Sequence, residues 1–158
     1  MMDPFVRAFL KASLAWLAIG TSIGVAMAFA PALVGWRPVH LHTLLLGFVA
    51  MMIFGVAYHV IPRFTGMPLR HPRAAGVHVW LANVGLLLLV AGFAMRAHAI
   101  AGAPIAMTGG GLLSALGAYL FAVNIWRTID TAVARDRARA DQAGSVSPAR
   151  SSMQILQQ

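Results

Sequence analysis

The chain has no cysteine among its 158 residues and only four acidic residues. The missing thiols exclude disulfides, thiolate metal sites and iron–sulfur clusters. Between Asp3 and Asp130 there is no Asp or Glu, so this long stretch cannot build a carboxylate proton relay, a hard-cation site or a carboxylate–histidine dyad. A metal or cofactor held there would be bound by imidazole or thioether groups, which suit haem iron or copper.

Charged residues in general are scarce: they make up 10% of the chain, whereas hydrophobic residues make up 59%. A soluble domain of this size could not bury so many apolar side chains, because much of a small globule is surface. The composition therefore predicts an integral membrane protein in contact with a lipid bilayer.

Four apolar segments are each long enough to cross a bilayer, which takes about 20 residues. We expect these spans at residues 13–35, 42–61, 76–95 and 103–126. The connections are short, so consecutive spans should be antiparallel. The sequence thus predicts an all-α fold, a transmembrane four-helix bundle over residues 1–130, in which Pro31 kinks the first helix.

Basic residues lie mainly on one side of this predicted bundle. Ten of the twelve Lys and Arg residues fall in the N-terminal segment, the loop between the second and third spans, and the C-terminal tail. The other two, Arg37 and Arg96, fall in the opposite loops. The positive-inside rule then places both termini in the cytoplasm of a multi-pass protein of the bacterial inner membrane. This topology explains the net charge of +8, and nucleic-acid binding is not expected.

The last segment, residues 131–158, is basic, low in aromatic residues and rich in Ser, Ala and Gln. Such a composition buries too little apolar surface to fold. We expect a disordered cytoplasmic tail that carries no functional site.

Histidines are the strongest functional candidates, because ionisable groups at membrane depth are costly and are therefore functional by default. His71 lies in a basic loop and is expected to be solvated. The other five border or enter the spans: at the outer side His40, His42 and His98, and at the cytoplasmic side His59 and His78, which with Tyr58 form a second candidate site. Any one of them could instead be an interfacial residue bonded to water and a backbone carbonyl, and Tyr58 could belong to an aromatic belt.

Two arrangements of haem can be compared with the spacing of these histidines. Two stacked haems would need His42 and His59 on one face of the second span, and His78 and His98 on one face of the third. At about 100° per residue, these separations of 17 and 20 residues give phase differences of about 100° and 160°. The spacing disfavours two haems between these spans and favours a single haem near the outer side.

His40 and His42 are two residues apart, so on a helix they should point to nearly opposite sides. One would bind iron, and the other would bond a haem propionate, cap the helix or bind a second metal. The second axial ligand would be His98, a residue of another helix, or a residue of another subunit. Arg37 lies at the same level and would either pair with a propionate or anchor the interface.

The segment Arg37-Pro38-Val39-His40-Leu41-His42-Thr43, with the apolar run after it, resembles the second transmembrane helix of subunit I of haem-copper oxidases. It is similar in particular to C-type oxidases and nitric oxide reductases, in which an Arg-Pro-x-His-Thr-like entry supplies an axial histidine of the low-spin haem b. The longer stretch to Ile61-Pro62-Arg63-Phe64-Thr65-Gly66 is also similar to haem- and copper-containing membrane proteins of nitric oxide stress. His40, His42, Tyr58 and Pro62 match short four-helix proteins identified as subunit I-like.

This resemblance implies haem b, with His40 or His42 as an axial ligand and His42 favoured because it lies deeper. It implies electron transfer or the binding of a diatomic gas, O2 or NO. Subunit I itself is much longer and brings further ligands from later helices, so this chain is too short for a complete oxidase or nitric oxide reductase site. Because the subunit I core repeats arcs of four helices, we expect a homotrimer or homodimer that shares ligands, or a respiratory electron-transfer partner.

Two other functions also fit these residues. The chain could be a copper-binding protein or a respiratory-complex assembly protein that uses His40, His42, His98 and nearby methionines. It could also be a structural membrane subunit without a cofactor. Whether the chain is itself an enzyme stays open at this point.

Overall fold

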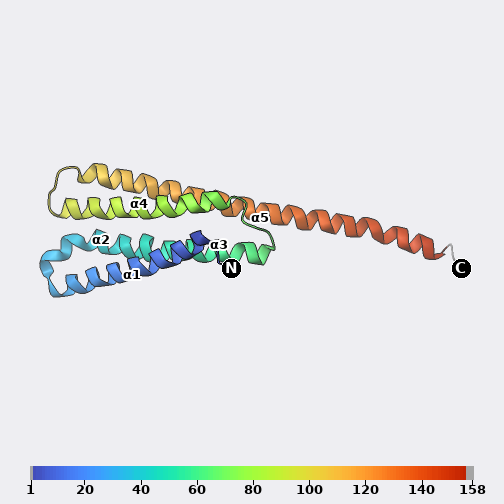
Figure 1. The fold of residues 1–158 in the computed structure, drawn as a ribbon, viewed down its shortest axis with the longest axis horizontal. Helices are drawn as coiled ribbons and strands as arrows, with labels where there is room; N and C mark the ends of the chain where they lie inside the picture. The colour runs from blue at the N-terminus through green and yellow to red at the C-terminus, as the bar shows by residue number, and fades with distance from the viewer. Residues whose placement is uncertain (1, 156–158) are drawn as a thin grey trace.

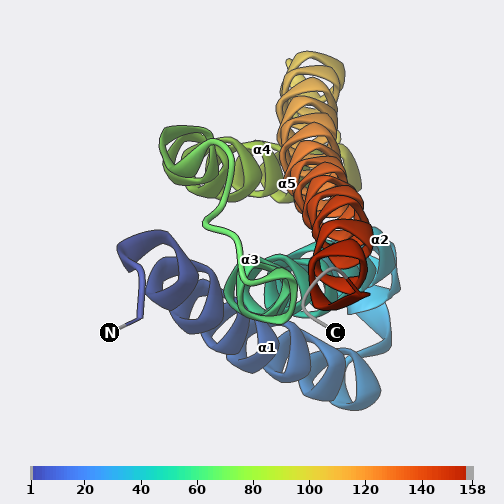
Figure 2. The same ribbon diagram turned by 90° about the vertical axis from the view of Figure 1, so that its right-hand side faces the viewer.

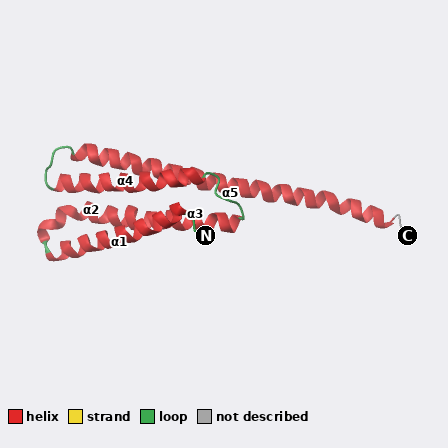
Figure 3. Cartoon of the chain, viewed as in Figure 1, coloured by secondary structure: helices red, strands yellow, loops and turns green. Residues whose placement is uncertain are grey.

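The computed structural model describes the backbone of residues 2–155 and the side chains of residues 2–143. Every regular element within the described residues is a helix, and Figure 3 shows only short loops between them. In chain order the elements are α1 (Pro4–Phe29), η1 (Pro31–Trp36), α2 (Arg37–His42), η2 (Thr43–Ala50), α3 (Met51–Thr65), α4 (Pro72–Ala97) and α5 (Ala103–Ile155). The prediction of an all-helical chain is confirmed.

The helices run up and down as two hairpins (Figure 1). One hairpin pairs α1 with the continuous rod formed by α2, η2 and α3, and the other pairs α4 with α5. Figure 2 looks along the bundle and shows the α1/α3 pair below the α4/α5 pair. The N-terminus, the loop after α3 and the part of α5 that leaves the bundle all lie at one end, here called the N-terminal end.

Four helices are long and apolar enough to cross a membrane: Pro4–Phe29, Pro31–Thr65, Pro72–Ala97 and Ala103–Ala143. Only 11–33% of the residues in their most apolar windows are buried inside the chain. The exposed positions are largely Leu, Ile, Val and aromatic residues, and water would not favour such a surface. A multi-pass membrane protein surrounded by lipid explains it.

The first helix is interrupted at its far end, where the sequence predicts a kink. Pro31 does not bend α1: the helix stops at Phe29, and Ala30 takes an extended backbone with φ −129° and ψ 93°. A residue that precedes proline is pushed out of the helical region by the proline ring. Pro31 then opens the short 3-10 helix η1, so the chain reverses direction at this point.

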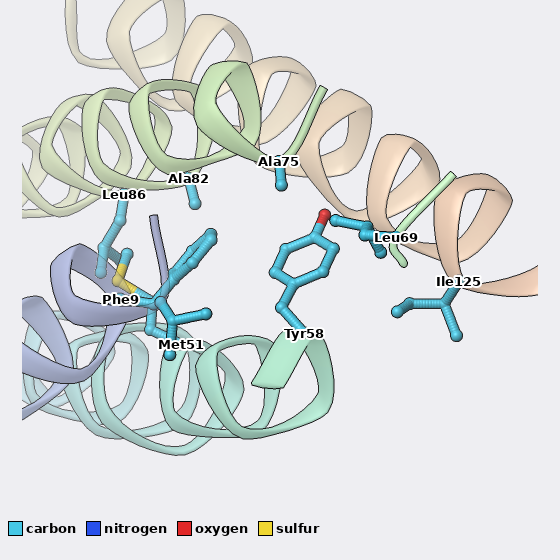
Figure 4. Packing of buried hydrophobic residues seen from close by; sticks show 9 residues of the cluster. Phe9, Met51, Tyr58, Leu69, Ala75, Ala82, Leu86 and Ile125 are labelled. Carbon is cyan, nitrogen blue, oxygen red and sulfur yellow. The ribbon is translucent and has the colours of Figure 1, made fainter. Parts of the chain in front are cut away.

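The core lies between the two hairpins toward the N-terminal end. Its members come from α1, α3, α4, α5 and the loop before α4: Val6, Phe9, Met51, Tyr58, Leu69, Ala75, Ala82, Leu86 and Ile125. Figure 4 shows Phe9 and Met51 pointing toward Ala82 and Leu86 of α4, and Tyr58 pointing toward Leu69 and Ala75. Between α4 and α5 the backbones themselves are in close contact, since a Cβ added to Gly110 would overlap the Leu89 nitrogen. Small residues permit this approach.

The segment after the fourth span differs from the expected disordered tail. Helix α5 continues without a break beyond residue 131 as far as Ile155. Residues 131–143 of this helix are rich in Ala and Arg, which favour helix. One stripe of this helix also binds the loop before α4: Asn124 bonds the backbone N–H and C=O of His71, Thr128 accepts a bond from the Arg70 N–H, and Arg135 donates to the carbonyls of Thr65 and Gly66.

Candidate functional site

The first candidate ligands lie on α2, at the end of the bundle away from the N-terminus. Pro38 occupies the first turn of this helix, where a missing N–H costs nothing and the fixed φ suits a helix. His40 and His42 lie in its last turn. Short as it is, α2 continues directly into η2 and α3, so both imidazoles are held by one long rod.

His40 points toward α1. Its Nδ1–H donates to the Gly20 carbonyl, 2.8 Å away. The ring rests against Gly24, where an added Cβ would lie 2.6 Å from Cε1 of the imidazole. Because a carbonyl only accepts, Nδ1 carries the proton and Nε2 carries the lone pair. His40 therefore packs between α1 and α2, and its position depends on a glycine opposite it.

His42 points toward α4 instead. Its Nδ1–H donates to the Pro38 carbonyl at 2.8 Å, and its ring lies 4.6 Å from the ring of Phe93 at a tilt of 36°. The lone pair is again on Nε2, which has no hydrogen-bond partner among the described residues. The side chain is half-buried. An imidazole held at Nδ1 and free at Nε2 has the form that a metal ligand requires.

The π-helix η2 follows His42 directly and spans eight residues, Thr43–Ala50. The Thr43 hydroxyl, fully buried, bonds the carbonyls of Val39 and His40 just before it. A π-helical turn holds more residues than an α-helical turn. The phase difference of about 100° between His42 and His59 assumes a regular α-helix along the whole rod, so the π-helix changes its value.

The other two candidates at this end of the bundle do not converge on His42. His98 follows the end of α4 and is exposed, and its Nε2 accepts a bond from the Trp36 indole N–H at 3.3 Å. The two rings also meet edge to face. Arg37 is exposed at the start of α2. Within residues 2–143 there is no group of three His, Cys, Asp or Glu side chains that could hold a metal ion.

The second candidate site is only partly assembled. Tyr58 of α3 and His78 of α4 are both buried, and the Tyr58 hydroxyl lies 3.2 Å from Nδ1 of His78. His59 does not join them: it accepts a bond from Arg63, one turn further along α3. Nε2 of His78 is buried without a hydrogen-bond partner, which is rare for a buried polar atom.

Aromatic rings surround His78, and the sequence analysis did not single them out. Phe54, Phe9 and Phe121 have ring centroids 4.6, 4.8 and 5.8 Å from the imidazole. They come from α3, α1 and α5, so His78 lies where four helices meet. Apolar phenylalanines in apolar spans give no signal of this role in the sequence.

No protein-family model matches the chain. The chain is 29% identical, over an alignment of 163 residues, to the Cbb3-type cytochrome c oxidase subunit CcoN1 of Stutzerimonas stutzeri. The match covers 82% of this chain and 34% of that protein, so the chain spans about a third of the length of the curated relative. This similarity supports a relationship to the haem-copper oxidase subunit I superfamily.

Proposed function

We propose that the chain is a b-type haem protein of the bacterial inner membrane, related to subunit I of haem-copper oxidases. His42 would hold the haem iron through Nε2. Bound haem would supply either one-electron transfer or the coordination of a diatomic gas. The chain spans about a third of the relative that it matches, so the proposal is limited to haem binding and does not extend to the whole activity of an oxidase.

One observation supports this proposal most directly: the state of the His42 ring. The His42 Nδ1–H donates to the Pro38 carbonyl, with 2.8 Å between Nδ1 and the oxygen. The Nε2 lone pair has no partner within the described residues, and the side chain is half-buried. Phe93 flanks the ring and fixes its plane. Haem iron takes a ligand of this kind, and a backbone carbonyl on the far nitrogen strengthens it.

His40 has the same tautomer, but its contacts indicate a structural role. Its ring is wedged against Gly24 and bonded to Gly20, so it ties α1 to α2. Copper is less well supported than haem, because a copper site needs several ligands together and residues 2–143 hold no such group.

A second protein ligand for the iron would come from a further chain. His98, the third histidine at this end, accepts a bond from Trp36 at Nε2. The outward faces of all the spanning helices carry exposed apolar side chains that could pack against lipid or protein. We therefore propose a homodimer or homotrimer in which a neighbouring chain or a respiratory partner completes the haem site.

The test is an absorption spectrum of the protein purified from cells supplied with haem, recorded reduced minus oxidised. The proposal predicts a b-type α-band that His42→Ala abolishes, whereas His40→Ala and His98→Ala keep it. Far-UV circular dichroism of each variant shows that it is folded. Copper without haem in the purified wild-type chain would favour the copper-binding alternative.

The oligomer is tested separately, by light scattering in a gentle detergent combined with haem quantification. We expect haem to be retained in the dimer or trimer and lost when the chains separate. A monomer that keeps its full haem content would contradict the shared site.

A further inference from the structure

The C-terminal part of α3, at the N-terminal end of the bundle, carries a feature that the haem proposal does not use. Arg63 donates from a single guanidinium nitrogen to His59, with distances of 2.8 Å to Nδ1 and 2.6 Å to the backbone carbonyl oxygen. Both residues lie in the last two turns of the helix, next to Phe64, which is 87% exposed.

The hydrogen bond from Arg63 determines which nitrogen of the His59 ring carries the proton. A guanidinium group only donates, so Nδ1 of His59 accepts and carries no proton. The proton of the neutral imidazole is then on Nε2, which makes no hydrogen bond within the described residues. His59 is therefore a donor at Nε2, the opposite of His42, and it is not poised as a metal ligand.

The same bond holds Arg63 in place while leaving most of it free. Two of the five N–H donors of a guanidinium group go to His59, so three remain. No acidic side chain pairs with Arg63 within residues 2–143, where the salt bridge found joins Arg135 to Asp136. The positive charge of Arg63 is therefore not compensated. A fixed cation and a neighbouring N–H donor together form a site for an oxyanion.

An apolar face leads away from these donors along α3. At about 100° per residue, Val56, His59 and Arg63 lie within about 60° of one another around the helix. Ile53 lies about 60° beyond Val56, on the side away from His59. Ile53 and Val56 are 54% and 46% exposed. Ten residues separate Arg63 from Ile53, which corresponds to about 15 Å of helix. That length is about half the hydrocarbon thickness of a bilayer, or one leaflet.

We propose that this face of α3 binds an anionic phospholipid of the leaflet at the N-terminal end of the bundle. The Arg63 guanidinium and the His59 Nε2–H bind the phosphate, and the acyl chains lie along Val56 and Ile53. Charge complementarity favours this ligand. The Arg63 cation, which has no acidic partner, lies at one end of an apolar surface about one leaflet long. A phospholipid likewise has a negative phosphate at one end and apolar acyl chains along the rest of its length. The positive-inside rule predicts that this leaflet is the cytoplasmic one.

The experiment measures retention of phosphatidylglycerol and phosphatidylcholine by the full chain, using native mass spectrometry across a lipid titration. We expect the wild-type chain to retain one phosphatidylglycerol at least tenfold more tightly than phosphatidylcholine. Arg63→Gln should lose this preference. Arg73→Gln is the matched control: it removes an exposed arginine at the same end, and it should weaken binding by about fivefold or less, the size of a general surface-charge effect.

His59→Phe separates a built site from general attraction to anionic lipid, because it leaves the net charge unchanged. The proposal predicts that His59→Phe loses most of the preference, and that His59→Gln, whose amide still donates, keeps more of it. Equal retention by wild type and His59→Phe would overturn the proposal. So would displacement of the lipid by millimolar inorganic phosphate, since acyl contacts with Ile53 and Val56 would then contribute nothing. Circular dichroism melting of each variant excludes unfolding as the cause of a loss.

Discussion

The Tyr58 hydroxyl lies 3.2 Å from Nδ1 of His78, and each side chain is about 1% exposed or less. This pair joins α3 of one hairpin to α4 of the other in a setting of phenylalanine rings. No Asp or Glu occurs between Asp3 and Asp130, and Tyr58 and His78 are each other's neutral hydrogen-bond partners. The pair thus links the two hairpins by a hydrogen bond in the core.

Tyr58→Phe should destabilise the chain by about 1–3 kcal/mol, because His78 would then have no partner at either ring nitrogen. Thermal unfolding in detergent, followed by circular dichroism, measures the loss. Tyr119→Phe is the matched control: Tyr119 is 70% exposed, and its hydroxyl should contribute little. The double variant Tyr58→Phe, His78→Leu should be less destabilised than the sum of the two single variants, since both polar groups are gone. If the stability loss of the double variant equals the sum of the losses of the two single variants, Tyr58 and His78 are not coupled.

The position of His40 gives a second prediction. A methyl group at Gly24 would lie 2.6 Å from Cε1 of the imidazole, so Gly24→Ala must displace the ring and break its bond to the Gly20 carbonyl. We expect a lower melting temperature. Gly109→Ala is the control, since a Cβ there meets nothing within 4 Å and alanine favours helix over glycine by up to about 1 kcal/mol. The same pair also tests the ligand assignment: if His42 binds the haem, Gly24→Ala keeps the α-band, and its loss would point to His40.

The sequence predicts the four spanning helices correctly, because long apolar runs permit little else in a bilayer. The opposite directions of His40 and His42 also follow from helical spacing. The π-helix after His42 could not be foreseen, since the stretch TLLLGFVA carries no local signal for it. The pairing of Tyr58 with His78, rather than of His59 with His78, depends on tertiary packing that spacing within one helix does not specify. The helix beyond residue 131 forms where composition predicted disorder, and its stripe of loop contacts explains part of the difference.

The contact between α5 and the loop before α4 gives a third prediction. Thr128 is buried, and its hydroxyl accepts the Arg70 N–H at 3.0 Å. Thr128→Val keeps the shape but leaves that N–H without its partner, so we expect the loop to open more often and trypsin to cleave faster after Arg70. Thr131→Val is the matched control, because the Thr131 hydroxyl bonds only a carbonyl of its own helix. Equal cleavage rates in the two variants would mean that Thr128 does not hold the loop.

The hydrogen bond between Trp16 and Asn83 gives the last prediction. The Trp16 indole N–H donates to Oδ1 of Asn83 at 3.3 Å, and the Asn83 amide donates to the Val79 carbonyl one turn earlier. This bond connects α1 to α4 within the spans, where water cannot replace a lost partner. Bonds between spanning helices contribute about 0.6 kcal/mol on average, so Trp16→Phe should lower stability modestly, through this bond and a smaller ring. Trp80→Phe makes the same change on a side chain that is 73% exposed and has no such bond. If Trp16→Phe and Trp80→Phe lower the unfolding midpoint equally, the loss of stability comes from the smaller ring and not from the bond to Asn83. A larger fall for Trp16→Phe that disappears in an Asn83→Leu background would assign the difference to the bond.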